Sequence, residues 1–255
     1  MITFAPGPQL APFVRVITLV ETGEEVTRAL LPATGIVLGV RYGGYASELD
    51  GEAARRLPQA TLAGMRRAGR RVRTSEGGGI ALATFTEVGA AAFFAAPLHE
   101  IAGQTVELAH FIPPREIERA LARLVDAAGP AQRVAVMREF LLGRLTRTSG
   151  DPLVAAAVDA IRSTRGSLRI GELARALAIS RDRLEKRFRH AVGASPKQLA
   201  SIHRLLHAVD LYRAGTNLTR LSADAGYFDQ SHFIREFRSF TGMAPQRYFR
   251  SVERC

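Results

Sequence analysis

Short apolar runs separated by glycine and charged residues fill the first 112 residues of the chain. The runs VRVITLVE, GIVLGVRY, ATLAGM, RRVRT and GIALATF have the length and residue types of β-strands. The run GAAAFFAA at 89–96 predicts a short helix, and TVELAHF at 105–111 predicts one more strand. Two helices with apolar residues at helical spacing follow at 115–126 and 131–145. We therefore expect a β-rich unit over 1–112 and a helical pair over 113–147.

The second half of the chain contains one hydrophobic pattern twice. IGELARALAISRDRLEKRFRHAVGASP at 170–196 aligns with LTRLSADAGYFDQSHFIREFRSFTGMAP at 218–245 when one extra residue is allowed in the second copy. Each copy predicts a short helix, a tight turn at Ala178 or Gly226, and a longer helix with a capping residue. This is the spacing of a helix-turn-helix motif.

A single long helix is predicted between the two copies. Residues 195–214 begin with the capping residue Ser195, continue with helical periodicity, and are followed by Gly215 as the expected end. A helix of about 30 Å could hold two DNA-reading motifs roughly one helical turn of DNA apart. Two further helices are expected at 151–165 and 246–252.

The longer helix of each copy has an apolar stripe on one side and polar residues opposite. The stripe comprises Leu184 and Phe188 in the first copy, and Phe233, Phe237 and Phe240 in the second. The opposite positions are Asp182, Lys186 and Arg189 in the first copy, and Ser231, Arg235 and Arg238 in the second. The stripe predicts a core face, which leaves the polar side free to enter the major groove of DNA.

Charge supports a polyanionic partner. Residues 1–150 contain 17 Lys and Arg against 14 Asp and Glu, whereas residues 151–255 contain 18 against 10, so the net charges are +3 and +8. Nucleic acid is the first candidate for this partner and an anionic membrane surface the second. The 47% hydrophobic and 23% charged residues are typical of a folded globular protein.

Several classes of site find no support in the sequence. No apolar run approaches the roughly 20 residues of a membrane span, and the amino terminus lacks a signal peptide, so a cytoplasmic location without a membrane partner is expected. Cys255 is the sole cysteine, and His99 and His110 are too sparse for a metal-dependent β-barrel enzyme. Nucleotide-binding and hydrolase motifs are absent. We predict no catalytic residue, metal or cofactor.

The second copy also carries a set of residues at characteristic positions: Gly226, Asp229, Gln230, Ser231, Phe233, Phe237, Gly242, Pro245, Tyr248 and Arg250. With this set, residues 151–255 resemble the DNA-binding domain of the AraC/XylS transcriptional regulators. The sequence departs from the family pattern at Tyr227 and Phe228, where the family has Phe followed by a small residue. The resemblance implies an α+β protein in which 151–255 is an all-α unit of two helix-turn-helix motifs joined by a long helix. It also implies that 1–150 is a cupin-like domain for effector sensing or dimerisation.

The resemblance places DNA contacts in the amino-terminal halves of the two longer helices. The implied base-contacting residues are Arg181, Asp182, Arg183, Glu185 and Lys186 in the first copy, and Gln230, Ser231, His232 and Arg235 in the second. Arg235 suits guanine and Gln230 suits adenine, whereas Arg189 and Arg238 suit phosphate. Asp182 and Glu185 could accept from cytosine, face solvent, or pair with Arg181 or Arg189. His232 could equally be a capping or solvent-facing residue.

Three hypotheses follow. The first is a regulator that binds double-stranded promoter DNA, responds to a small-molecule effector in its first half, dimerises through that half and contacts RNA polymerase. The second makes the first half a dimerisation or protein-docking module, for which a filled barrel interior would be evidence. The third is an enzyme domain fused to a nucleic-acid-binding domain. The basic cluster Arg66, Arg67, Arg70, Arg71 and Arg73 could bind an anion or be a solvated charge run.

Overall fold

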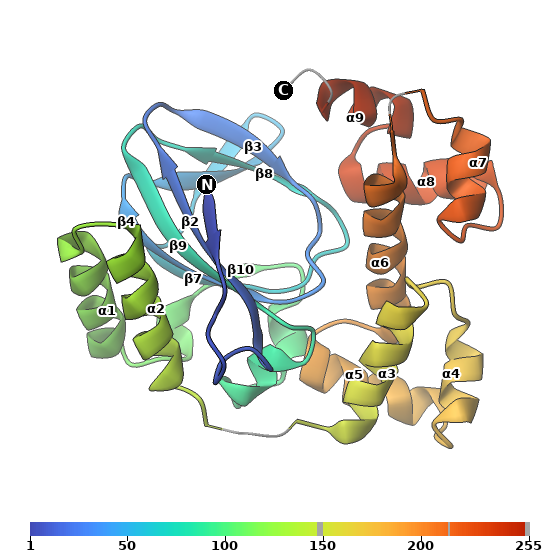
Figure 1. Ribbon diagram of the computed structural model, residues 1–255, viewed down its shortest axis with the longest axis horizontal. Coiled ribbons are helices and arrows are strands. Elements are labelled where there is room, and N and C mark those ends of the chain that lie inside the picture. The colour runs from blue at the N-terminus through green and yellow to red at the C-terminus, as the bar shows by residue number, and fades with distance from the viewer. Residues whose placement is uncertain (147–149, 214, 253–255) are drawn as a thin grey trace.

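The computed structural model describes residues 1–146, 150–213 and 215–252, which form a β-sheet domain followed by helices (Figure 1). A six-stranded antiparallel sheet has the order β1-β2-β9-β4-β7-β10, and a four-stranded antiparallel sheet has the order β3-β8-β5-β6. The strands are β1 Ile2–Phe4, β2 Val14–Thr22, β3 Val26–Leu30, β4 Val37–Gly43, β5 Ala46–Asp50, β6 Ala53–Arg56, β7 Ala60–Ala63, β8 Arg70–Thr74, β9 Gly78–Phe85 and β10 Thr105–Glu107.

The alternation of residues along β9 explains how the larger sheet packs. Ala81, Ala83 and Phe85 are completely buried on one face of this strand. The first hydrophobic core lies on that face, where α1 (Pro114–Asp126) and α2 (Pro130–Leu142) cover the sheet. Ile80 and Leu82 point to the opposite face, toward the smaller sheet, and are only partly buried. The strand therefore separates a filled core from a less densely packed interior.

The five runs predicted as strands in 1–85 are confirmed as β2, β4, β7, β8 and β9. Strands β1, β3, β5 and β6 were not predicted, and β3 and β6 are largely exposed, which removes the hydrophobic signal. The strand predicted at 105–111 is wrong beyond Glu107, because the chain turns into the 3-10 helix η3 (Leu108–His110) that buries Leu108. The helix predicted at 89–96 is only a short 3-10 helix, η1 (Gly89–Ala92).

Within the described residues of the second half, all regular secondary structure is helical. The elements are α3 Pro152–Ser163, α4 Ile170–Ala176, α5 Arg181–Val192, α6 Pro196–Leu211, α7 Leu218–Asp224, α8 Gln230–Thr241 and α9 Pro245–Val252. Figure 1 shows the pair α4–α5 at one end of α6 and the pair α7–α8 at the other. The predicted α+β class, with a β domain, following helices and a helix-turn-helix domain, is confirmed.

The turn between the two helices of each motif requires a left-handed residue. Gly226 supplies it in the second copy with φ of 79°, whereas Ala178 adopts φ of 51° in the first. Glycine reaches this region without a steric penalty, but alanine does not. The hydrogen bond from the Ile179 amide to the Ala174 carbonyl closes the same turn that Tyr227 and Ser222 close in the second copy. The geometry of the motif therefore outweighs the local preference of Ala178.

The predicted long helix is shorter than expected. Helix α6 ends at Leu211, and Tyr212 has an extended backbone with φ of −62° and ψ of 134°. The ring of Tyr212 stacks on Phe249, with centroids 3.7 Å apart, which explains why the chain leaves the helix here. The predicted continuation to 214 and the stop at Gly215 are therefore wrong, and Ala214 itself lies outside the described residues. The 16 residues of α6 span about 24 Å.

Candidate nucleic-acid interface

The outward side of α5, which we call the α5 face, is polar and exposed. Leu184 and Phe188 are completely buried beneath it, as the stripe predicted. The predicted DNA-contacting residues of this helix are all exposed: Arg181, Asp182, Arg183, Glu185, Lys186 and Arg189. Arg189 Nη2 lies 2.8 Å from Glu185 Oε1, which is one of the alternatives left open for Glu185. An exposed pair of this kind contributes about 0.3–0.5 kcal/mol, so both groups remain available to DNA.

The outward side of α8, the α8 face, carries cations without a protein partner. Ser231, Arg235 and Arg238 are exposed on it, opposite the buried stripe of phenylalanines. Among the residues that the structure describes, the guanidinium groups of Arg235 and Arg238 form no ion pair or hydrogen bond. Both can therefore bind an external anion or base edge without first breaking an internal contact.

Gln230 and His232 are more constrained than the arginines. Thr219 Oγ1 donates a 2.9 Å hydrogen bond to Gln230 Oε1, which holds the side chain of Gln230 against α7. The His232 backbone N–H donates to Asp229 Oδ1 at 2.6 Å, so His232 sits in the capped first turn. Its ring lies edge-on to Tyr227 at 5.5 Å. Neither placement tests a DNA contact, and these roles, like those on the α5 face, stay predictions.

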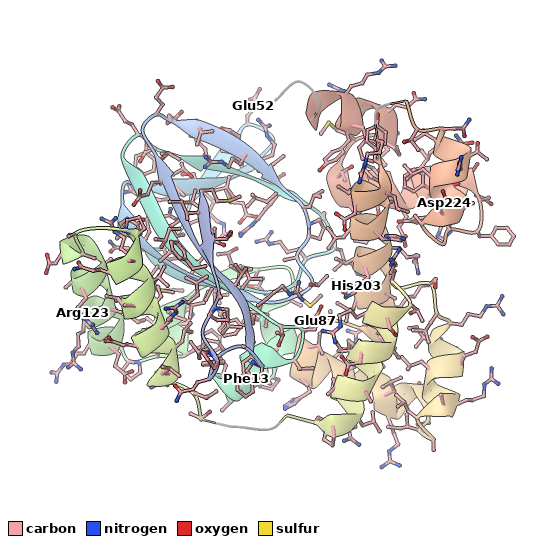
Figure 2. The ribbon with its side chains drawn as sticks, in the orientation of Figure 1. Phe13, Glu52, Glu87, Arg123, His203 and Asp224 are labelled. Carbon is pink, nitrogen blue, oxygen red and sulfur yellow. The ribbon has the colours of Figure 1, made fainter. Side chains whose placement is uncertain are left out.

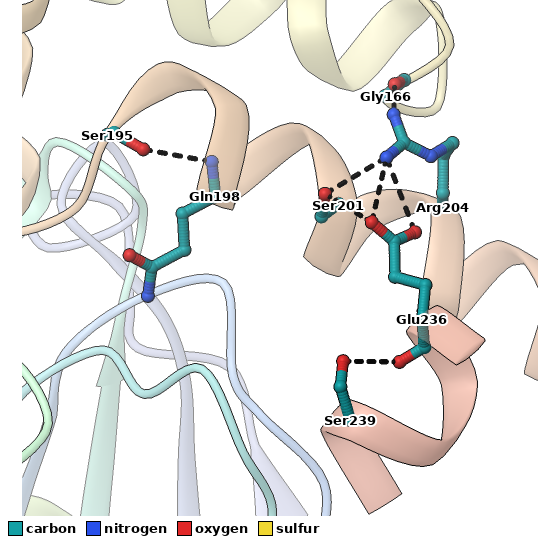
Figure 3. Close-up of polar contacts among 7 residues, drawn as sticks. All are labelled: Gly166, Ser195, Gln198, Ser201, Arg204, Glu236 and Ser239. Atoms are coloured by element: carbon teal, nitrogen blue, oxygen red, sulfur yellow. Dashed lines mark hydrogen bonds and ion pairs between the residues drawn. The ribbon is translucent and has the colours of Figure 1, made fainter. Parts of the chain in front are cut away.

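A buried polar network fixes α8 against α6 (Figure 3). Arg204 Nη2 lies 3.1 Å from Glu236 Oε1, and Ser201 Oγ donates to the same oxygen at 2.8 Å. Arg204 Nη1 donates to the Gly166 carbonyl oxygen at 2.7 Å, which adds the loop before α4 to the network. Because the side chains of Arg204 and Glu236 are only 14% and 16% exposed, this pair is shielded from solvent.

The first motif has an ion pair at the equivalent position. Arg187 aligns with Glu236 in the repeat, and its guanidinium makes two hydrogen bonds to the carboxylate of Asp151, at 2.6 and 2.7 Å. Asp151 caps α3, and the hydrogen bond from Arg187 lowers its pKa. In both copies, the second helix of the motif is thus linked by one side chain to the helix that precedes the motif. The charges are reversed between the copies, because the motif helix carries the cation Arg187 in the first and the anion Glu236 in the second.

The two halves of the protein also share polar contacts. Glu87 from the β domain and His203 from α6 lie beside each other at the boundary (Figure 2), with Oε1 and Nε2 3.4 Å apart. Arg15 donates to the same Glu87 oxygen at 2.7 Å. A backbone hydrogen bond joins the Gly69 amide to the Phe240 carbonyl at 2.5 Å, at the end of α8. The β domain therefore contacts α6, which joins the two motifs, and the end of α8 in the second motif.

The interior between the two sheets contains a cavity of about 320 Å³. Arg41 of β4 is 5% exposed and lines it, together with Arg66 and Arg70 of the basic cluster. We had not predicted Arg41 as a site residue. The available signal was an arginine in GIVLGVRY, a run whose neighbouring apolar residues predict a buried strand. The basic cluster noted in the sequence is therefore split, because Arg66 and Arg70 line the cavity whereas Arg67 and Arg71 are exposed on the surface.

The residues that the structure describes contain no group of three or more His, Cys, Asp or Glu side chains placed to hold a metal ion. Within the same residues, every helix is too short or too polar to cross a membrane.

The comparisons with known proteins identify the class of this interface. Residues 173–251 match the family model described as a helix-turn-helix domain. This carboxy-terminal region is a helix-turn-helix DNA-binding domain of the AraC/XylS type. The Xylose operon regulatory protein of Escherichia coli strain K12 is 28% identical over 142 residues, covering 51% of this chain and 35% of that protein. The chain thus spans about a third of that relative's length.

Two solved structures resemble nearly the whole chain. ToxT from Vibrio cholerae has 14% identity and a TM-score of 0.50, and the match covers 91% of this chain and 96% of that one. An apo ToxT variant from Vibrio cholerae strain SCE256 has 13% identity and the same TM-score, with 93% and 96% covered. At these identities the likeness shows the fold alone: a β-sheet domain joined to a helical domain.

Proposed function

We propose that the protein is a cytoplasmic, sequence-specific transcription regulator that binds promoter DNA with both helix-turn-helix motifs. The observation that carries this proposal is the repeated arrangement of an exposed polar helix face at each end of α6. Each face contains arginines, which suit guanine edges and phosphates. The basic excess of the second half adds attraction to a polyanion.

The proposal includes control by a small molecule that binds in the N-terminal domain. A domain used only for dimerisation or docking would be expected to have a filled interior. Here Ile80, Leu82 and Val72 are only partly buried around a cavity of about 320 Å³, the size of a small-ligand site. The effector would act by stabilising one arrangement of the two halves, because a ligand shifts an equilibrium only through different affinities for its states.

We further propose that the protein binds a second copy of itself through the N-terminal half and contacts RNA polymerase at the promoter. The domain division at residue 150 is part of the same proposal. Activation and repression are both compatible with this architecture.

Selection of bound sequences from a random DNA pool tests the proposal. The full-length protein is used at two salt concentrations. The variant Arg119→Ala removes an exposed charge on α1, away from both helix faces, and should recover the same DNA sequence. Two short half-sites about one helical turn apart would support reading by both motifs. Binding that depends on salt but yields no sequence motif would overturn sequence-specific regulation, because it would reduce the interface to phosphate contacts.

A further inference from the structure

The cavity in the N-terminal domain lies between the two sheets and is lined by both. Strand β4 contributes Val37 and Arg41, which alternate with residues packed in the first core. Strand β8 contributes Arg70 and Val72 from the smaller sheet. The apolar part of the wall includes Val37, Leu57, Met65, Val72, Ile80 and Leu82. A largely apolar cavity thus contains a small number of inward-facing cations.

Arg41 is the most unusual of these cations. It is 5% exposed, and burial lowers its pKa. Its guanidinium has no ion pair or hydrogen bond with any residue that the structure describes, and Nε is buried without a partner. A buried charged group without a partner is costly in free energy. An anion from outside the chain would remove that cost.

Two other largely buried arginines of the same protein are paired. Arg204, whose side chain is 14% exposed, reaches Glu236. Within the cavity, Arg66 Nη1 lies 2.7 Å from Glu48 Oε1, so its charge is balanced. An arginine that only held the fold together would be expected to show a similar carboxylate or carbonyl partner. Arg41 lacks one.

Arg70 is a second cation available to a ligand. Its Nη1 donates to Thr105 Oγ1 at 2.7 Å, a neutral partner that leaves its charge unbalanced. Burial and then the neighbouring charge of Arg66 lower its pKa. No Asp or Glu is among the described residues that line the cavity. The interior therefore has a net positive charge directed at the space between the sheets.

We propose that the effector is a small organic acid whose anionic group binds Arg41 and Arg70 while its apolar body contacts Val37, Val72 and Leu82. This inference rests on the proposed control by a small molecule and specifies the chemistry of that ligand. A guanidinium binds a carboxylate through two parallel hydrogen bonds, which supplies both orientation and affinity. The apolar wall favours an acid with a hydrocarbon body over a small inorganic anion.

Matched ligands test the charge requirement on the full-length protein. Octanoate and 4-tert-butylbenzoate are compared with their primary amides by titration calorimetry and by the shift in thermal midpoint, with inorganic phosphate and sulfate as further probes. We expect at least one acid to bind and its amide to bind at least about 30-fold more weakly, because the amide leaves the buried cations unpaired. Equal binding of acid and amide, binding of inorganic anions only, or no binding by either acid would overturn the inference.

Matched variants test the residues. Arg41→Met and Arg70→Met each remove one inward-facing charge, whereas Arg71→Met removes an exposed charge from the same strand as Arg70. The two inward variants should raise the Kd of the acid by about 30-fold or more, and Arg71→Met should leave it within about twofold. Thermal unfolding without ligand confirms that each variant folds. Unchanged affinity in both folded inward variants would overturn the assignment.

Measurements of DNA binding test this inference separately from the proposed control by a small molecule. DNA affinity is measured with and without the acid that binds best. An acid that binds through Arg41 without changing DNA affinity would support the ligand chemistry but contradict effector control. If the amide binds as well as the acid and changes DNA affinity, control by a small molecule is supported, but the inference that this molecule must be an acid is overturned.

Discussion

Glu87 of the β domain and His203 of α6 lie beside each other where the two halves of the protein meet. Glu87 Oε1 lies 3.4 Å from His203 Nε2, and the Glu87 side chain is 2% exposed. Arg15 donates to the same oxygen, so the carboxylate lies between two basic groups. Because α6 carries a helix-turn-helix motif at each end, this contact is placed to connect the state of the β domain with the arrangement of the motifs.

The first prediction is a loss of stability in acid that depends on Glu87. Burial alone would raise its pKa, but contacts with His203 and Arg15 outweigh burial and lower it from 4.5 to about 2. The folded pKa is below the unfolded one, so the contribution is complete above pH 4.5 and is lost as pH falls toward 2. Its size is on the order of 3 kcal/mol. Denaturant unfolding at several pH values across this window measures it.

Glu87→Gln should flatten the pH dependence in this window and lower stability at neutral pH, because His203 and Arg15 lose their carboxylate. Glu139→Gln is the matched control, since Glu139 forms an ion pair with Arg123 that is about half exposed on both sides. That control should change stability by less than about 1 kcal/mol. An unchanged acid response in Glu87→Gln would contradict the role given to this contact.

The second prediction uses two equivalent glycines. Gly193 ends α5 and Gly242 ends α8, both with a left-handed backbone at φ of 84° and 74°. Alanine costs roughly 1–2 kcal/mol in that conformation. A Cβ at Gly193 would also lie 2.9 Å from the Leu98 carbonyl oxygen of η2 (Leu98–Ile101) in the N-terminal half, whereas nothing lies within 4 Å at Gly242. Gly193→Ala should therefore be more destabilising than Gly242→Ala by about 1 kcal/mol or more.

Denaturant unfolding of both variants measures that difference. Equal losses of stability in Gly193→Ala and Gly242→Ala would show that η2 does not pack closely against the end of α5 in solution.

The third prediction concerns the link between α6 and α8. Glu236→Ala should lower stability by about 2 kcal/mol or more, because Arg204 would remain shielded from solvent without its carboxylate. The more specific effect is on DNA, since Glu236 orients α8 and not α5. We expect weaker selection at the half-site read by α8 and little change at the half-site read by α5. Sequence selection with the variant, at a temperature where it is folded, measures both.

Arg187→Ala is the reciprocal variant, because Arg187 occupies the equivalent position in the first motif and binds Asp151. It should weaken selection at the other half-site. Loss of both half-sites in either variant would indicate general unfolding in place of local misorientation. The pair of variants also assigns each half-site to its motif.

The sequence predicted the helical half better than the β half for a physical reason. Helix periodicity, caps and glycine stops are local signals, so the stripe of Phe233, Phe237 and Phe240 and the cap at Asp229 were visible without tertiary information. The end of α6 has no such local signal, because Tyr212, the residue just beyond it, stacks on Phe249 far along the chain. The exposed strand β6 has no hydrophobic alternation to detect.

The two candidate sites also differ in how far the sequence predicts them. Exposed positions on α5 and α8 follow from helical spacing, and the structure exposes the predicted side chains there except Gln230 and His232, which are partly buried. The cavity depends on the pairing of strands distant in sequence, which brings Arg41 of β4 and Arg70 of β8 to one interior. Neither arginine carries a motif. Sequence could note a basic cluster around Arg70, but only the sheet register separates inward Arg70 from outward Arg71.

The last prediction distinguishes base reading from phosphate binding on the α8 face. Arg235 and Arg238 are both exposed without a described partner, yet Arg235 lies closer to the amino-terminal end of α8, where helices of this motif approach base edges. Arg235→Ala should cost about 1–3 kcal/mol on the preferred sequence and relax selection at one base pair. Arg238→Ala should weaken binding to all sequences and reduce the salt dependence by about one unit. Affinities measured on the selected and a scrambled site at several salt concentrations separate these results. Equal losses on both sites from both variants would contradict the assignment of Arg235 as the base-reading residue.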